Sequence, residues 1–125
     1  MNFDVPLFSP ADAGEILAEL TAIHRFTLYE YFITDKIGHA QSFEKAEFYL
    51  PLLAAFVREI LKRIDLKNTT VILTSDHGNI EDLSIRTHTL NDVPTIIWGR
   101  QRDEVAQKIK DLSDVTPAIL DLLSD

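Results

Sequence analysis

The chain has 125 residues, enough for one domain with a buried core, and no linker-like stretch divides it. Its 12 Lys and Arg against 20 Asp and Glu give a net charge of -8, which argues against a nucleic-acid partner because such binding needs clustered cations. No apolar run approaches the ~20 residues of a membrane span. The absence of cysteine excludes disulfides and thiolate metal sites and fits a reducing, cytoplasmic compartment. Any bound metal must therefore be held by oxygen and imidazole.

The first half of the chain begins with a helix signal. Residues 9–12 read Ser-Pro-Ala-Asp, in which a serine cap, a proline at the first helical position and an early aspartate favour a helix, here to about residue 23. Residues 26–33 are rich in aromatic and β-branched types and predict a strand. The polar residues 35–41, which include a glycine, predict a loop.

A long amphipathic helix is predicted next, from a cap at Ser42 to about residue 64, with apolar residues at a period near 3.6. Pro51 lies inside this stripe and predicts a kink or a later start of the regular helix. Residues 69–74 and 94–98 predict two buried strands, and Ser113 or Asp114 is expected to cap a last helix through residue 123. This order predicts an α/β fold: a layered, mostly parallel sheet with helices on both faces.

Three of the four histidines lie just beyond or between predicted strands, each beside carboxylate, glycine or hydroxyl residues. Residues 35–39 (Asp-Lys-Ile-Gly-His) follow the first strand, residues 76–79 (Asp-His-Gly-Asn) follow the second, and His88 precedes the third. Ligands of open α/β sheets bind beyond the carboxyl ends of the strands. Gly38 and Gly78 each adjoin a histidine, as expected where the backbone bends tightly around a site. Two aspartates and three histidines at one edge predict a nitrogen and oxygen site for Zn²⁺, Mn²⁺ or a similar ion.

The alternative is that these residues are ordinary surface polarity. For any one Asp-His pair, a turn-capping aspartate beside an exposed histidine is the simpler interpretation. Three such segments at strand ends favour the metal site. His24 lacks such neighbours and is interpreted as a histidine at a helix end, where it interacts with the helix dipole.

These segments resemble the C-terminal metal motifs of the alkaline phosphatase superfamily. They are similar above all to its metalloenzyme branch, which includes cofactor-independent phosphoglycerate mutases and phosphopentomutases. The motifs that carry the resemblance are Asp35-x-x-x-His39, residues 74–79 (Thr-Ser-Asp-His-Gly-Asn), and His88-Thr89 followed by Val93-Pro94. The likeness runs from about residue 26 to residue 99, and residues 112–123 look like the closing helix of the superfamily.

The resemblance implies a phosphatase- or phosphomutase-type metalloenzyme, a hydrolase or an isomerase, acting on a phosphorylated small molecule. It implies two divalent ions, manganese or zinc. Asp35, His39 and His88 match the ligands of one ion, and Asp76 and His77 match two ligands of the other. At least the first ion is expected to bind this chain.

Asn79 and Glu81 are candidates to orient these ligands, and exposed loop polarity explains them equally well.

The nucleophile of the family has no counterpart in the sequence. In the family, a Ser or Thr nucleophile and a further aspartate precede the matched segment, and residues 1–25 lack their pattern. The hydroxyls at Thr34, Ser75 and Thr87 are interpreted as loop residues that hydrogen-bond locally. We therefore expect residues 1–125 to be the C-terminal segment of a single α/β domain, completed by a missing N-terminal portion or a partner chain. The alternative is a non-catalytic module that binds a metal or ligand.

Overall fold

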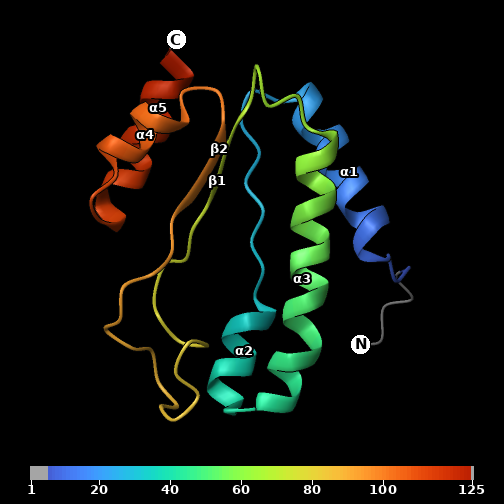
Figure 1. The fold of residues 1–125 in the computed structure, drawn as a ribbon, viewed down its shortest axis with the longest axis vertical. Coiled ribbons are helices and arrows are strands. Elements are labelled where there is room, and N and C mark those ends of the chain that lie inside the picture. The colour runs from blue at the N-terminus through green and yellow to red at the C-terminus, as the bar shows by residue number, and fades with distance from the viewer. Residues whose placement is uncertain (1–5, 125) are drawn as a thin grey trace.

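The computed structural model describes residues 6–124, in which helices lie on either side of a two-stranded sheet (Figure 1). The elements are α1 (Pro10–Ile23), α2 (Ile33–Ala40), α3 (Phe43–Arg63), β1 (Thr70–Leu73), β2 (Ile96–Gly99), α4 (Arg102–Lys108), a 3-10 turn (Leu112–Asp114) and α5 (Val115–Ser124). Among these residues, no helix is long and apolar enough to cross a membrane.

The helix starts follow the predicted caps in two of three cases. The Ser9 hydroxyl accepts a hydrogen bond from the Asp12 amide at 3.2 Å, and the Asp12 carboxylate accepts one from the Ser9 amide, which forms a capping box. Ser42 caps α3 in the same way. The predicted cap of the last helix is wrong, because the side chain of Asp111 caps the 3-10 turn that leads into α5.

Helix α3 runs without interruption past Pro51, so the predicted later start is wrong. The apolar stripe of α3 was predicted to be buried against the sheet, but Phe56 and Ile60 lie on the side of α3 that faces α1. Gly14 of α1 lies so close that a Cβ atom there would sit 2.8 Å from Glu59 Cβ, and the ring of Tyr29 lies 5.1 Å from that of Phe56. Phe56 and Ile60 are therefore buried against α1 and the segment that follows it.

The sheet differs from the prediction. Strands β1 and β2 pair antiparallel, with Thr70 opposite Gly99 and Leu73 opposite Ile96. A parallel pair needs a crossover connection, usually a helix, and residues 74–95 between these strands contain turns, bends and one isolated bridge but no helix. The chain is thus a mixed α/β structure, and a layered parallel sheet is not found among the described residues.

The strand predicted at residues 26–33 is not formed. In the part of the chain that the structure describes, residues 26–31 are neither helix nor strand, and the amides of residues 26–32 donate no hydrogen bond to another backbone group. Figure 1 shows this segment running between α3 and β1. The chain then enters α2, where a loop was predicted. A strand needs a paired neighbour, whereas a helix satisfies its own backbone, so local pattern misassigned both segments.

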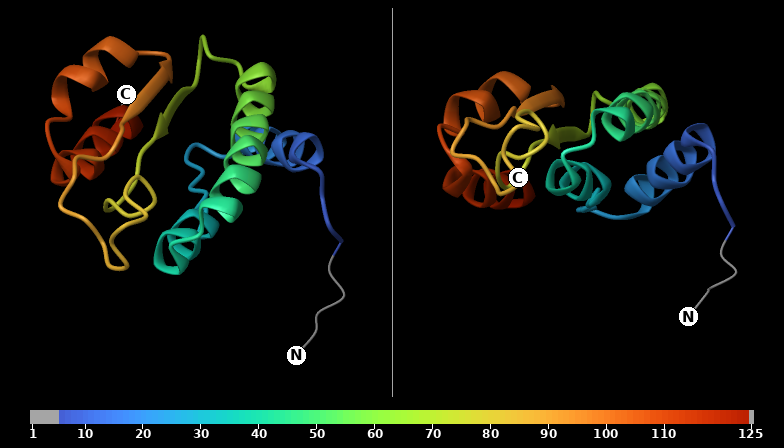
Figure 2. Two further views of the ribbon diagram at one scale, coloured as in Figure 1. Left: turned by 60° about the horizontal axis from the view of Figure 1, so that its bottom comes forward. Right: turned by 90° about the horizontal axis from the view of Figure 1, so that it is seen from below.

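An open groove separates α3 from the two strands, while α4 and α5 lie on the opposite side of β2 (Figures 1 and 2). The groove has a volume of about 640 Å³. Its walls are mostly apolar and consist of Leu50, Leu53, Ala54, Val57, Arg58, Leu61, Lys62, Leu73, Ile96 and Trp98. The apolar core of the described residues is correspondingly small and consists of Ala18, Ile37, Ala46, Phe56, Ile60, Val105 and Ala118.

Candidate metal centre

Helix α2 places Asp35 and His39 on one face. Residues four apart on a helix are neighbours, and His39 Nε2 lies 3.3 Å from Asp35 Oδ1. Asp35 is in the first turn and His39 in the last turn, where the helix dipole favours an anion and a cation respectively. The four-residue spacing of Asp35 and His39 fits this helix, although residues 35–41 were predicted to form a loop.

Two loops bring His77 and His88 together. The Thr89 amide donates to the Gly78 carbonyl at 2.9 Å in an isolated antiparallel bridge, and the two imidazole rings stack with centroids 3.5 Å apart. A Cβ atom at position 78 would overlap the Thr89 hydroxyl. The φ angle of Gly78 is not positive, so the close approach of the two loops, and not a special backbone angle, requires a glycine here.

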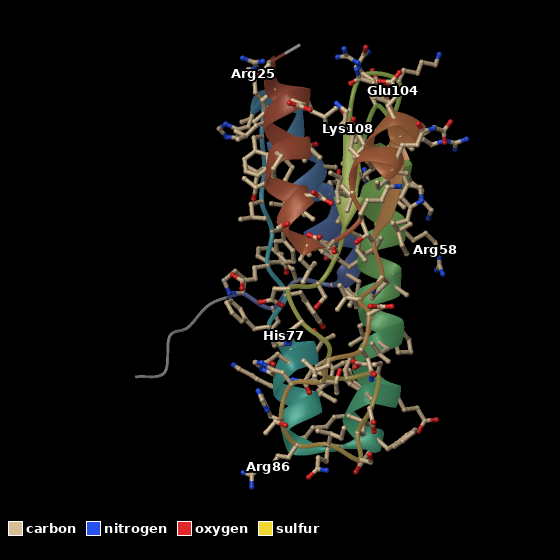
Figure 3. The ribbon with its side chains drawn as sticks, turned by 90° about the vertical axis from the view of Figure 1, so that its left-hand side faces the viewer. Arg25, Arg58, His77, Arg86, Glu104 and Lys108 are labelled. Carbon is tan, nitrogen blue, oxygen red and sulfur yellow. The ribbon has the colours of Figure 1, made fainter. Side chains whose placement is uncertain are left out.

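The side chains converge on one oxygen, Oδ1 of Asp35. His39 Nε2 is 3.3 Å and His88 Nε2 is 3.5 Å from this atom, and the ligating atoms of these three residues all lie within 4.8 Å of one another. His77 Nε2 is 3.9 Å from the same oxygen and 3.5 Å from Asp76 Oδ1. The structure thus brings His39, His77 and His88 to Asp35, whereas the side chain of Asp76 is 81% exposed and contacts the adjacent His77. Figure 3 shows His77 above α2, whereas the side chain of Arg86 points into solvent below.

The orientation of the His39 ring is fixed from behind. Nδ1 lies 2.8 Å from the carbonyl oxygen of Arg86, and a carbonyl can only accept, so Nδ1 carries the proton. In a neutral imidazole Nε2 is then the nitrogen with a free lone pair, which a metal ligand needs, and it lies 3.3 Å from Asp35 Oδ1. The sequence carries no signal for this contact, because every residue has a main-chain carbonyl.

Asn79 contacts Asp35 directly, and the exposed Glu81 contacts Asn79 and Thr89. Asn79 is 4% exposed, and its Nδ2 donates to Asp35 Oδ1 at 2.7 Å, so exposed loop polarity does not describe it. Glu81 accepts from the Asn79 amide at 2.6 Å, from the Thr89 hydroxyl, and from Asn91 Nδ2 at 3.1 Å. These hydrogen bonds lower the pKa of Glu81 to about 2, and the one from the Thr89 hydroxyl has the largest effect. Glu81 thereby clamps the two histidine-bearing loops together.

The remaining singled-out residues have local roles. Thr34 donates to the Tyr31 carbonyl at 3.2 Å and Ser75 to the His77 carbonyl at 2.9 Å, as the sequence analysis expected of loop hydroxyls. Thr87 is exposed, and His24 is the C-cap residue of α1.

The donor set fits a divalent ion. Two imidazole nitrogens and a carboxylate oxygen, all partly accessible to solvent, are the ligand types that zinc and manganese take from proteins, and three protein ligands are typical of an open catalytic site. The hydrogen bond from His39 Nδ1 to the Arg86 carbonyl is of the kind that metal-ligating histidines usually make with their other nitrogen.

Comparison with known proteins shows which family the sequence of this chain matches. The profile of the Metalloenzyme superfamily matches residues 11–124. Similar curated proteins are 2,3-bisphosphoglycerate-independent phosphoglycerate mutases. The one from Ehrlichia ruminantium (strain Gardel) is 29% identical over 96% of this chain and 26% of its own length. That from Wolbachia pipientis wMel is 30% identical over 94% of this chain and 25% of its own length. That from Clostridioides difficile (strain 630) is 29% identical over 78% of this chain and 21% of its own length.

The chain therefore spans about a quarter of the length of these relatives. Among solved structures, no match was found. The match over residues 11–124 confirms the resemblance noted from the motifs, and the chain belongs to the Metalloenzyme superfamily.

Proposed function

We propose that the chain is the metal-binding portion of a phosphomutase- or phosphatase-type enzyme that acts on phosphate monoesters through a two-metal site. The observation that carries this proposal is the convergence of His39 Nε2 and His88 Nε2 on Asp35 Oδ1. Similarity to proteins named phosphoglycerate mutases supports a phosphomutase, with phosphoglycerate as the substrate.

In this proposal, Asp35, His39 and His88 hold one ion, and Asp76 and His77 contribute to the other. When bound, such ions polarise a phosphoryl oxygen and lower the pKa of an attacking hydroxyl. The residues of the chain supply the charge and the orientation. Asp35 lies at the centre, His39 presents Nε2 because Arg86 holds Nδ1, and the exposed Asp76 faces His77 at the outer side of the cluster.

The attacking hydroxyl and the remaining ligands come, in this proposal, from the rest of a longer protein or from a partner chain. Three observations support it. The relatives are about four times longer, the groove beside α3 is open, and the buried Thr27 hydroxyl has no partner among the described residues. Residues 26–32 would then pair with a strand from that portion. This pairing would extend the sheet toward the layered, mostly parallel form of an alkaline-phosphatase-like domain.

Calorimetric titration of the 125-residue chain with Mn²⁺ and with Zn²⁺ tests metal binding. We expect at least one ion per chain. His88→Ala should weaken binding at least about tenfold, because removing even an outer partner of a metal ligand costs that much. His24→Ala, at the end of α1, is the matched control and should bind as the parent does. Affinity should fall as the pH drops, because a protonated imidazole cannot ligate. A chain that binds neither ion at neutral pH would contradict the proposal.

Hydrolysis of p-nitrophenyl phosphate tests the second half of the proposal. With Mn²⁺ or Zn²⁺ the chain alone should show only weak turnover, because the attacking hydroxyl is supplied from elsewhere. A protein that also carries the remaining portion should be active, and His88→Ala should abolish this activity. Robust activity of the chain alone, lost in His88→Ala, would show that no further portion is needed. A longer protein that binds metal without turnover would favour a non-catalytic module.

A further inference from the structure

Asn79 is a buried polar residue in the loop that follows β1. Only 4% of it is exposed. Its Nδ2 donates two hydrogen bonds to one residue of another element, at 2.7 Å to Asp35 Oδ1 and at 3.3 Å to the Asp35 carbonyl oxygen in α2. This amide is therefore the direct link between the loop and the carboxylate at the centre of the cluster.

The orientation of the amide is set by Asp35 alone. A carboxylate can only accept, so the NH₂ end of Asn79 must face it. The other end, Oδ1, is buried and has no hydrogen-bond partner among the described residues. Burying an unpaired carbonyl oxygen lowers stability. A residue whose role was only to tie two segments together would be expected to use both ends of its amide, whereas Asn79 uses the donor end.

Both neighbours of this side chain are adapted to it. The main-chain amide of Asn79 donates to Glu81 Oε2 at 2.6 Å, which fixes the backbone from which the side chain extends. On the other side, Gly38 of α2 packs against the amide so closely that a Cβ atom there would overlap Asn79 Oδ1 and Cγ. Gly38 is helical and buried, so close approach, and not a special backbone angle, requires a glycine at this position.

We infer that Asn79 is a positioning residue for the metal ligand Asp35, seated on Gly38 and held by Glu81. A carboxylate oxygen has two lone pairs, and Asn79 takes one of those on Oδ1. The carboxylate is thereby held in one orientation, toward His39 and His88, with its other lone pairs free. This inference rests on the proposed function, because it assigns to Asn79 an effect on metal binding.

The test uses Asn79→Leu in the 125-residue chain. Leucine has the same branching and heavy-atom count as asparagine but no donor, so it fills the site without holding Asp35. We expect Mn²⁺ affinity, measured by calorimetry, to fall about 10–100-fold. The visible spectrum of bound Co²⁺, which reports coordination geometry, should change as well. Asn68→Ala is the matched control, because it removes an Asn–Asp hydrogen bond of the same length, 2.7 Å, in the turn before β1. It should alter neither measurement.

A second route reaches the same hydrogen bond without changing Asn79. Gly38→Ala should push the amide away from Asp35 and weaken Mn²⁺ binding to a similar extent. In an Asn79→Ala background the added methyl group meets no amide, so Gly38→Ala should then cost little further affinity. This cycle also decides the matter if Asn79→Leu does not fold, because Asn79→Ala only removes atoms.

The outcomes separate the inference from the proposed function. A parent chain that binds no ion contradicts the proposed function and the inference with it. A parent that binds, with Asn79→Leu or Asn79→Ala folded and equal to it in affinity and Co²⁺ spectrum, contradicts the inference alone. A Gly38→Ala effect of the same size in the presence and absence of the Asn79 amide contradicts the seating of Asn79 on Gly38.

Discussion

Two carboxylates, those of Asp35 and Glu81, organise the candidate metal site. Asp35 Oδ1 accepts from Asn79 and has the Nε2 atoms of three histidines within 3.9 Å. Glu81 holds the loops on which two of these histidines lie, through the Asn79 amide and the Thr89 hydroxyl. A carboxylate is suited to this role because its two oxygens accept several donors at once.

Glu81→Gln should lower the melting temperature near neutral pH, because a glutamine presents one oxygen where Glu81 uses two. The pKa of Glu81 is lowered in the fold from 4.5 to about 2, so the ionised carboxylate stabilises the fold above pH 4.5. This contribution is lost as the pH falls from 4.5 through about 2. The difference in melting temperature between the two proteins should therefore shrink over this range. Circular dichroism at a series of pH values measures it, and a constant difference would contradict the clamp.

At the scale of elements, the closest packing joins α1 to α3, and Gly14 makes it possible. A Cβ atom at this position would lie 2.8 Å from Glu59 Cβ and 3.2 Å from the Phe56 carbonyl oxygen. Neither atom is the end of a flexible side chain, so the helices themselves would have to separate. Phe56 and Ile60, which make up much of the core of this half, would lose contacts.

Gly14→Ala should therefore destabilise the chain, although alanine favours a helix by about 1 kcal/mol over glycine. Overpacking costs about 1–3 kcal/mol, and the immobile neighbours place this site toward the upper end. We expect a net loss of about 1–2 kcal/mol in the free energy of unfolding by urea. Glu19→Ala and Glu19→Gly, at an exposed position of α1, give the helix-propensity difference without packing. A Gly14→Ala gain equal to that difference would show that the helices are not in close contact.

Pro51→Ala should stabilise α3. Proline removes one hydrogen bond of the helix interior and is less favourable there than alanine by about 3 kcal/mol. The Pro51 side chain is exposed, so its removal costs little packing. We expect a gain of about 1–3 kcal/mol in urea denaturation. An unchanged or lower stability would mean that the proline is needed for the helix as it stands.

At the scale of the whole molecule, the described residues leave apolar side chains exposed and the amides of residues 26–32 without backbone hydrogen bonds. The groove beside α3 is lined by side chains such as Leu53, Val57 and Trp98. Along the adjacent extended segment, Phe26 and Leu28 are exposed by 50% and 79%. Exposed apolar surface of this kind is what the proposed remaining portion would cover.

Hydrogen exchange should show the unpaired backbone of residues 26–32 directly. The amides of residues 26–32 make no backbone hydrogen bond among the described residues, so they should exchange much faster than those of α3 in the chain alone. In a protein that carries the remaining portion, the same amides should become protected. Mass spectrometry after peptic digestion measures both. Slow exchange of residues 26–32 in the chain alone would contradict the unpaired segment.

The sequence predicted the parts of the fold that depend on local chemistry. The capping box at Ser9, the cap at Ser42 and the apolar stripe of α3 need only neighbouring residues, and these helices begin where predicted. Strands 69–74 and 94–98 were found within two residues of their bounds as β1 and β2. The segments around α2 were misassigned because an aromatic run without a partner strand remains extended and unpaired.

The sequence by itself predicted the candidate ligands and pointed to the family that residues 11–124 match, because ligand types and their spacing can be read along the chain. The gathering of Asp35, His39 and His88 follows from that spacing only in part. Tertiary structure alone decided that the sheet pairs antiparallel, that Arg86 holds His39 by its carbonyl, and that Asn79 rests on Gly38 beneath Asp35. These contacts join residues more than 20 positions apart, and several use main-chain atoms. Their energies depend on distances that only the folded chain sets.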